Sequence, residues 1–376
     1  MEDQSIRFEV FRSHEPLKVA WSVFQNEACC TVFQTYEWAS HLLDTVGRAH
    51  SAVPAIVLLS NAEGVPLMLL PLTKRQHEGA RLLEFIDFDT SDYNAPLIRR
   101  DFAMELARQD FSTLWSKILK HIGPVDAVKL RKMPPTIDGA PNPFHQLNCQ
   151  KDLVGFNCSL QSGFTEYMNT RGGHMNRELR RSRRKLEGEG PVELRIASDP
   201  ETASEYLKTI IQFKSAWCRA NGIPDQLSKP IYSSLYDAIA SQEVRGIAHT
   251  SALMVGERMI AGNFGFIHRG RFYGIIQSSD FENYKAYSPG NLMLVELMRW
   301  CSENGISIFD FSIGSESYKG RWADDEEQLY QYGQAMSIPG MLIETRRRVV
   351  TSFKASAPPQ LVETLRNLRT KVRPSI

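Results

Sequence analysis

The sequence lacks any run of apolar residues long enough to cross a membrane as a helix, which takes about 20 residues. Its first ten residues, MEDQSIRFEV, have neither a basic start nor an apolar core, so they do not predict a secretory signal. An excess of one charge is also missing, because 44 basic and 43 acidic residues leave a formal net charge of +1. We therefore expect a cytoplasmic protein in which any anionic partner is bound by a local cluster of basic residues.

Cysteines are few and widely spaced. The six are Cys29, Cys30, Cys149, Cys158, Cys218 and Cys301, and no pair has the short spacing of a zinc or dithiol motif. We expect reduced, mostly buried thiols and no metal site. The motifs G-x-S-x-G, H-E-x-x-H and G-x-x-x-x-G-K-[ST] are absent, which argues against a serine hydrolase, a zincin and a P-loop NTPase.

The remaining composition is that of an ordinary globular protein. With 376 residues and 42% hydrophobic content, the chain is long enough for two domains of usual size. Helices and strands are expected to recur in a similar α/β order on both sides of a proline-rich segment at 133–144. We predict an N-terminal α/β half at 1–150, a second half at 151–340 and a basic helical tail at 341–376.

Hydrophobic patterns predict the elements of each half. In the first half we expect a hairpin of strands 54–60 and 67–72, a strand 82–88, a helix 102–122 and a strand 127–130. In the second half we expect a helix or helix pair at 164–186, helices 201–221 and 232–241, and strands 192–196, 246–255, 259–268 and 271–278.

Residues 281–322 carry the most readable chemistry. Ser288 is expected to cap a helix with Pro289 in its first turn, and Gly290 leaves that turn open to an anion. The helix should end at 304–305 and lead into a strand at 306–311, a strand–helix–strand order that favours parallel pairing. Two interpretations remain open here: a cradle for a phosphorylated cofactor, or a well-capped helix that binds nothing.

Asp310 lies in an apolar strand, where an unpaired carboxylate would be costly to bury. Its side chain could act as a general base or orient one, or it could pair with an arginine or with backbone donors. The loop 312–322 follows and concentrates hydroxyls, a carboxylate, a phenol and a lysine beside glycines. Such a loop at the end of a strand is typical of a functional site, although a solvated loop is the alternative.

The densest local charge lies within the predicted helical segment 164–186. Arg177, Arg180, Arg181 and Arg184 fall on one broad face of a helix. This face could meet the phosphates of a cofactor, RNA, an anionic polysaccharide or lipid headgroups, or it could be solvated only. Because no RNA-binding aromatic motif or zinc spacing accompanies it, nucleic acid is the least favoured partner.

Several motifs together resemble a known family. They are Tyr287-Ser288-Pro289-Gly290, the strand Phe309-Asp310-Phe311 with Gly314, and Tyr318-Lys319 with Arg321-Trp322, supported upstream by Phe33-Gln34, Trp38, Ser91-Asp92-Tyr93 and the run from Asn176 to Leu194. The pattern resembles GNAT-superfamily acyltransferases of the CelD-like, cellulose-biosynthesis type, which are distant relatives of FemAB-like peptidyltransferases. The resemblance covers the chain up to about residue 332.

The resemblance implies a GNAT-type fold with twin halves of mixed sheets flanked by helices. It also implies an acyl-CoA donor, expected to be acetyl-CoA, and an amine or hydroxyl acceptor on a saccharide or small polar molecule, as in polysaccharide biosynthesis. The superfamily's pyrophosphate loop would correspond to Lys285, Ser288 and Gly290, with Tyr287 and Asn291 beside it. Lysine and serine replace the usual arginine or glutamine and glycine of that loop.

From this resemblance we predict roles for the site residues. Asp310 is the expected base and Tyr318 the acid for the leaving thiolate, while Lys319 holds an anionic acceptor or a phosphate. A cleft between the halves would place Asp92 and Tyr93 at the acceptor. Trp322 would form the wall of the pocket, and Arg177 is a further substrate-binding candidate.

Two rival hypotheses belong to other functional classes. An aminoacyl-tRNA-dependent transferase would use the basic helix on RNA, although the chain lacks the long charged helical hairpin of the FemAB-like enzymes. A non-catalytic GNAT scaffold would instead contact a membrane surface or a polysaccharide-synthesis complex through its basic tail.

Overall fold

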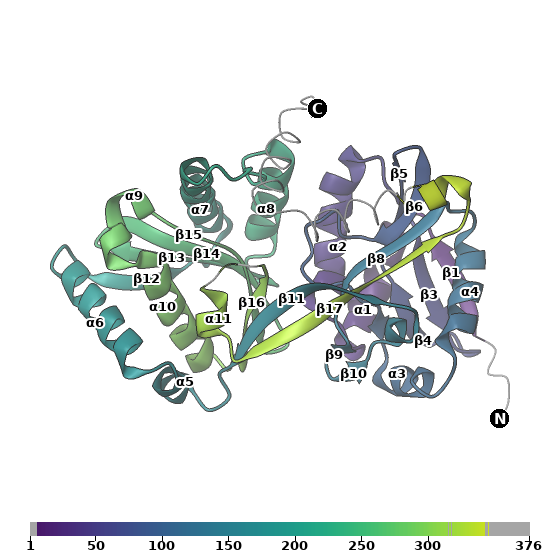
Figure 1. Ribbon diagram of the computed structural model, residues 1–376, viewed down its shortest axis with the longest axis horizontal. Coiled ribbons are helices and arrows are strands. Elements are labelled where there is room, and N and C mark those ends of the chain that lie inside the picture. Colours follow the sequence, from purple (N-terminus) through teal and green to yellow (C-terminus); the bar gives the residue numbers. More distant parts are fainter. Residues whose placement is uncertain (1–5, 315, 317, 343–344, 346–376) are drawn as a thin grey trace.

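This computed structural model describes residues 6–314, 316, 318–342 and 345, which form two lobes side by side (Figure 1). No helix within these ranges is both long and apolar enough to span a membrane. The residues 346–376, which make up most of the predicted basic tail, lie outside the described part of the chain. Most strands of both lobes belong to one eleven-stranded sheet, and a separate four-stranded sheet lies in the first lobe.

The first lobe combines the four-stranded sheet with the last strands of the large sheet. The small sheet has the order β1-β3-β4-β7, and β8, β6, β5 and β2 end the large sheet. The strands are β1 (Arg7–Phe11), β2 (Val53–Pro54), β3 (Ile56–Ser60), β4 (Pro66–Leu70), β5 (Leu72–His77), β6 (Ala80–Phe85), β7 (Leu97–Ile98) and β8 (Ala127–Met133). The helices are α1 (Lys18–Glu27), α2 (Tyr36–Leu42), α3 (Arg100–Leu106) and α4 (Phe111–Ile122).

The second lobe contains the strands β12-β13-β14-β15-β16 in that spatial order. Their bounds are β12 (Val192–Ile196), β13 (Ala248–Val255), β14 (Arg258–His268), β15 (Arg271–Ser279) and β16 (Ile308–Ile313). The helices are α5 (Phe164–Thr170), α6 (Gly173–Glu187), α7 (Pro200–Ala220), α8 (Pro230–Gln242), α9 (Phe281–Tyr284), α10 (Pro289–Glu303) and α11 (Lys319–Trp322).

Two long strands, β11 (Gln150–Ser159) and β17 (Asp325–Ala335), join the lobes. β11 follows the first lobe in sequence but pairs with β16, whereas β17 follows the second lobe but pairs with β8. The two strands also pair with each other and run together across the middle of the molecule in Figure 1. The first lobe therefore completes its sheet with β17, a strand that follows the second lobe in the sequence.

Each lobe contains one strand–helix–strand unit with parallel pairing. In the second lobe, α10 connects β15 to β16, and the pairing covers three positions from Arg271↔Ile308 to Tyr273↔Asp310. In the first lobe, α3 and α4 connect β6 to β8, and Leu82↔Ala127 and Leu83↔Val128 are paired. This correspondence fits the predicted GNAT-type fold with twin halves.

Alternation along β16 assigns its residues to two faces of the sheet. Phe309 and Phe311 enter the hydrophobic core beneath α10, together with Phe272 of β15. Asp310 and Ser312 point the opposite way, toward the first lobe, where Tyr93 packs with Tyr273 in a core shared by both lobes. The predicted polar residues of this strand thus face the boundary between the halves.

Most predicted elements of the second half are present, and segment 164–186 is a pair of helices, as the prediction allowed. The single helix predicted at 102–122 is wrong, because α3 ends at Leu106 and α4 starts after Asp110, whose carboxylate accepts a hydrogen bond from the Ser112 N–H. The sequence analysis also missed β11 and β17 altogether.

The Tyr93 hydroxyl donates across the lobe boundary to Asp310 Oδ1 at 3.0 Å, and both groups are buried. Tyr93→Phe should lower the free energy of unfolding by about 1–3 kcal/mol, because it leaves a buried carboxylate oxygen with one donor fewer. Urea unfolding of the variant and the wild type measures the difference.

Tyr287→Phe provides the control, since the Tyr287 hydroxyl donates to Glu189 at 2.8 Å at the exposed surface. Its effect should stay within about 0.5 kcal/mol. Equal destabilisation by the two variants would contradict a special role for the bond between the lobes.

Candidate functional site

The chain brings one group of predicted residues together at the boundary between the lobes. Asp310 is 0% exposed, and both of its oxygens are occupied. Oδ2 accepts from Arg271 at 2.8 and 2.9 Å, while Oδ1 accepts from the Tyr93 hydroxyl and from the Ser312 N–H at 2.6 Å. These contacts match the alternative in which Asp310 pairs with an arginine and a backbone donor, and they leave no oxygen facing a substrate.

Asp92 lies in the loop between β6 and β7 and is partly exposed. Burial between the lobes raises the pKa of its carboxyl to about 6, although Lys132, Lys319 and the Ser312 hydroxyl each lower it. Asp310 raises the same pKa further, since two like charges are costly side by side. A carboxyl with a pKa near neutrality is suited to proton transfer.

Two residues around Asp92 have unusual environments. Ser312 adopts a left-handed backbone conformation with φ of 60°. Its buried hydroxyl lies near the Asp92 carboxyl but forms no hydrogen bond of good geometry with a described residue. Lys319 is also buried, and its Nζ donates to the Ile313 carbonyl at 2.6 Å and lies 3.1 Å from Glu316. Lys319 is therefore near Asp92 but is already paired with other groups.

Sequence analysis missed two charged residues of this group. Arg271 bridges Asp310 and Glu327, whose Oε2 lies 3.8 Å from the guanidinium. Burial raises the pKa of Glu327 to about 7, and Arg271 lowers it. Arg271 could have been found, because the predicted strands 271–278 and 306–311 were expected to pair in parallel. That pairing places Arg271 on the strand next to Asp310. Glu327 could not, because β17 was not predicted.

A second group of predicted residues surrounds the start of α10. Ser288 precedes the helix with φ of 51°, and its side chain makes no capping hydrogen bond, so the predicted side-chain cap is wrong. The Asn291 N–H donates to the Ser288 carbonyl at 3.0 Å, whereas no described carbonyl accepts from the Gly290 N–H. Of the N–H groups of Gly290 and Asn291, only that of Gly290 lacks a described acceptor and could bind a pyrophosphate.

The other residues of this second group lie close by. Lys285 is exposed in the turn before α10, and the Tyr287 hydroxyl bonds Glu189. Trp322 is 1% exposed and its Nε1 donates to Asn291 Oδ1 at 3.4 Å, so it belongs to the core beneath α10. Tyr318 packs against the same core, and burial raises the pKa of its phenol.

The strands β15 and β16 separate between these two groups. They pair only as far as Tyr273 and Asp310, yet β15 continues to Ser279 and β16 to Ile313. A register shift against β14 pairs Phe264 with Ile276 and Gly265 with Gly274, which leaves Ile275 as an extra residue in β15. The separation starts beside Asp310 and widens toward the N-terminal end of α10.

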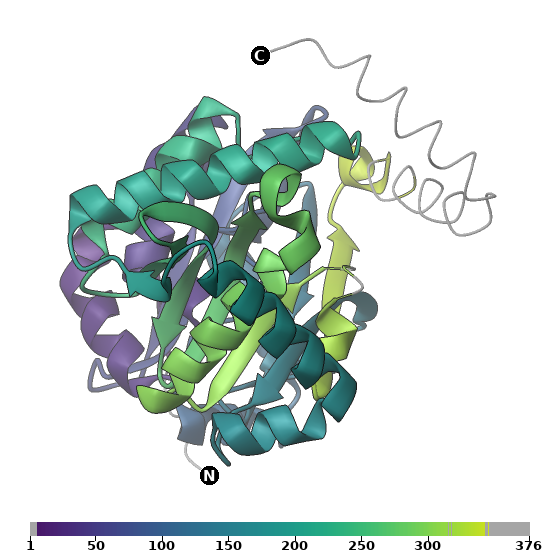
Figure 2. The ribbon, with the colours of Figure 1, turned by 90° about the vertical axis from the view of Figure 1, so that its left-hand side faces the viewer.

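Arg177 lies apart from both groups, on the exposed face of α6. Five exposed cations line a groove there: Arg177, Arg180, Arg181, Arg184 and Lys185. The opposite face of α6 packs against α10 through the ion pair of Arg183 with Glu296. Figure 2 shows α6, in dark teal, crossing in front of α10 on the outside of the second lobe.

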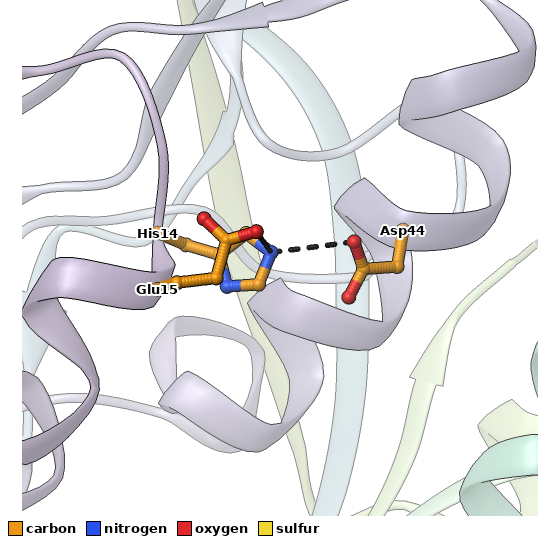
Figure 3. Close-up of side chains that lie close together, drawn as sticks. All are labelled: His14, Glu15 and Asp44. Carbon is orange, nitrogen blue, oxygen red and sulfur yellow. Dashed lines mark hydrogen bonds and ion pairs between the residues drawn. The ribbon is translucent and has the colours of Figure 1, made fainter.

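One group of His, Asp and Glu side chains in the described residues is close enough to share a metal ion, and it lies away from these sites (Figure 3). His14 Nε2 is 3.4 Å from Asp44 Oδ1 and 3.9 Å from Glu15 Oε1. The Tyr36 hydroxyl contacts the other ring nitrogen at 3.1 Å, and Arg48 pairs with Asp44. These hydrogen bonds of His14 and the ion pair of Arg48 with Asp44 account for the cluster, which no prediction from the sequence had included.

Comparison with protein families identifies the strand–helix–strand unit around α10. Residues 173–320 match the family model of the acetyltransferase (GNAT) domain. The matched segment begins at α6, ends within α11, and contains β15, α10 and β16. A comparison with curated proteins gives no match.

Solved structures resemble this chain over most of its length. FemX has 10% sequence identity and a TM-score of 0.59, with 84% of this chain and 95% of that chain covered. L-PGS from Bacillus licheniformis has 14% identity and a TM-score of 0.52, covering 91% and 99%. A conserved protein of unknown function from Bacteroides thetaiotaomicron has 11% identity and a TM-score of 0.51, covering 86% and 99%. At such identities the likeness concerns the fold, and it extends over both lobes.

The raised pKa of Asp92 gives a prediction for stability. Because the folded protein binds this proton more tightly than the unfolded chain, the contribution of Asp92 to stability falls as the pH rises from about 4 to about 6. Asp92→Asn lacks this titration and should be more stable than the wild type by about 1–3 kcal/mol above pH 7.

Urea unfolding of both proteins between pH 4 and pH 8 measures this difference. Asp89→Asn is the control, because that carboxylate is exposed in the same loop. A difference between Asp92→Asn and the wild type that did not change with pH would contradict the raised pKa.

Proposed function

We propose that this chain is an acyltransferase that moves an acyl group from acyl-CoA to an amine or hydroxyl of a saccharide or another small polar acceptor. The observation that carries the proposal is the separation of β15 from β16 beside the N-terminal end of α10. The separated strands give an extended thioester arm a place between them, and the helix end attracts its phosphates. The match to the GNAT domain over the same segment supports this assignment.

The donor's pyrophosphate would lie at the first turn of α10. Gly290 supplies a free N–H, and an ideal Cβ at this position would lie 3.6 Å from Gln277 Nε2. The side chain of Gln277 donates to the Gly290 carbonyl at 2.9 Å and so fixes this turn against β15. Lys285 adds a positive charge from the preceding turn.

The acceptor would bind between the lobes, where Asp92 is accessible. In the reaction, the acceptor's nitrogen or oxygen attacks the thioester carbonyl, the new C–N or C–O bond forms and the C–S bond breaks. The acceptor's proton passes to Asp92, and Tyr318 returns a proton to the departing thiolate. The backbone of β15 at Ile275, which has no partner on β14, would donate to the developing oxyanion.

Asp310 orients its neighbours in this proposal and is not the base that the resemblance implied. Because its oxygens bind Arg271, Tyr93 and the Ser312 N–H, we assign it to positioning and assign the base to Asp92. Its hydrogen bond to Tyr93 keeps the loop that carries Asp92 against β16. Lys319 sets the electrostatic environment of the same carboxyl.

A charge at position 290 tests the donor site. Gly290→Glu should weaken CoA binding by at least a hundredfold, because the carboxylate lies where the phosphates would lie. Gly290→Gln has nearly the same size without the charge, and it should lose about tenfold or less. Isothermal titration with CoA and acetyl-CoA measures both effects, and circular dichroism shows whether each variant folds. Equal affinity in the wild type and Gly290→Glu would refute the phosphate site.

A second candidate, an aminoacyl-tRNA-dependent transferase, is favoured by the basic groove on α6. Within the described ranges, no ion pair links its five cations to carboxylates. Glu189, just after the C-terminal end of α6, accepts a hydrogen bond from the Tyr287 hydroxyl, so this end of α6 lies beside the turn before α10. A nucleic acid would thus meet positive charge next to the donor site. This candidate uses nucleic acid, the partner that the sequence favoured least.

Salt dependence of RNA binding tests this second candidate. Bulk tRNA should bind with an affinity that falls steeply with salt, and Arg180→Ala/Arg184→Ala should reduce the logarithmic slope by about 1–2. The control is Lys208→Ala/Arg219→Ala, which removes two exposed cations from α7. Fluorescence anisotropy at 50–300 mM salt measures the slopes. Equal slopes for the two double variants, or no binding, would exclude this candidate.

A further inference from the structure

An unpaired polar side chain lies on the sheet face beneath α10. Asn263 on β14 is 1% exposed, and its Oδ1 has no hydrogen-bond partner among the described residues. A buried amide oxygen without a donor costs about 1–3 kcal/mol, so native proteins rarely keep one without a use. The amide oxygen therefore needs a donor that the described chain does not supply.

The position of Asn263 connects it to the proposed donor site. Its neighbour across the ladder on β15 is Gln277, whose side chain bonds the first turn of α10. An ideal Cβ at Gly274 would lie 3.7 Å from Asn263 Nδ2 and 3.5 Å from the Asp310 carbonyl oxygen. The amide thus lies beside the point where β15 and β16 begin to separate, and Nδ2 is the nearer of its two polar atoms to Gly274.

Gly274 leaves room at this point. The contacts of its ideal Cβ are all of ordinary van der Waals length, so the space accepts at least a methyl group. The ring of Phe272 forms an apolar side, with Cε1 3.8 Å from that Cβ. A small group entering between the strands would therefore meet one aromatic ring and one amide.

His249, on the same face, also has two ring nitrogens without partners among the described residues. Its ring packs against Trp300 at 4.6 Å and against the edge of Phe272 at 5.3 Å, and burial lowers its pKa to about 4. Because Phe272 contacts both His249 and the space at Gly274, it separates the histidine from that space. Asn263 is the orphan group that remains beside the gap.

We propose that Asn263 selects the acyl group, and that the preferred donor is an acyl-CoA whose acyl chain carries a hydroxyl or amino group close to the carbonyl. The substituent donates a hydrogen bond to Asn263 Oδ1, and the carbon chain lies over Gly274 against Phe272. An unsubstituted acyl group leaves the amide oxygen unpaired and binds more weakly. This inference rests on the proposed acyl-CoA site.

Three ligands of equal carbon number test the inference: propionyl-CoA, lactoyl-CoA with a 2-hydroxyl, and alanyl-CoA with a 2-amino group. In titration calorimetry, the wild type should bind lactoyl-CoA or alanyl-CoA about five- to tenfold more tightly than propionyl-CoA. The ligand that gains shows which substituent the site takes.

Asn263→Leu replaces the amide with an apolar group of similar size. It should bring the affinity ratio between the substituted and unsubstituted ligands to about one, while propionyl-CoA binds within about twofold of its wild-type affinity. Thr250→Val is the matched control, because Thr250 Oγ1 is also buried without a described partner. Thr250 lies opposite Phe264, the neighbour of Asn263 in β14, and therefore on the other face of the sheet. This control should keep the wild-type ratio.

The outcomes separate the two proposals. If the wild type binds CoA but all three acyl-CoA ligands equally, a water molecule satisfies Asn263 and this inference is wrong while the donor site stands. If the wild type binds neither CoA nor any acyl-CoA, both this inference and the acyl-CoA assignment are wrong. The wild-type ratio decides the question even if Asn263→Leu does not fold.

Discussion

A carboxylate that is withdrawn completely from water needs a full set of donors, and Asp310 obtains them from both lobes. Arg271 comes from the neighbouring strand, the Ser312 N–H from its own strand and the Tyr93 hydroxyl from the first lobe. Removing any one donor leaves part of the charge unsatisfied in a region of low dielectric constant. The relative position of the lobes and the path of the loop at 87–94 therefore depend on this one side chain.

That loop also explains why the two similar halves have different sites. In the first lobe, β6 and β8 separate after two paired positions, as β15 and β16 do after three. Lys132 is held there by Asp87 at 3.0 Å and by the Ser91 carbonyl at 2.7 Å, and the Asn94 N–H bonds the Lys132 carbonyl. The loop thus occupies the edge of β8 and presents Asp92 and Tyr93 to the second lobe. In the first lobe the loop therefore fills the space between the separated strands, and its side chains contribute to the site in the second lobe.

Patterns in the sequence predicted the unit around α10 because each signal there is local. Proline and glycine at a helix start, an apolar helix and a β-branched strand all depend on neighbours within a few residues. Asp310 was recognised as needing a partner, although Arg271, 39 positions earlier, was not identified as that partner. The free N–H of Gly290 and the left-handed Ser288 depend on the detailed turn geometry, which residue types alone do not determine.

The strands β11 and β17 could not be predicted for a different reason. β17 reads DEEQLYQYGQA, with many charged and amide side chains and no β-branched residue, so its intrinsic preference for a strand is weak. It is a strand because β11 and β8 lie on either side of it. The sequence also could not show that the Asn263 amide oxygen lacks a hydrogen-bond donor. A missing partner can be recognised only when all neighbours in space are known.

The pairing of β17 with the first lobe has a consequence for synthesis on the ribosome. The chain emerges from its N-terminus, yet the strand that covers β8 of the first lobe ends at Ala335. Until that strand emerges, β8 has an open edge available for pairing with other chains. Contacts between such distant segments also form slowly, since a long loop must close before any bond is gained. The nascent first lobe is therefore the stage at which this protein is most exposed to aggregation and depends most on chaperones.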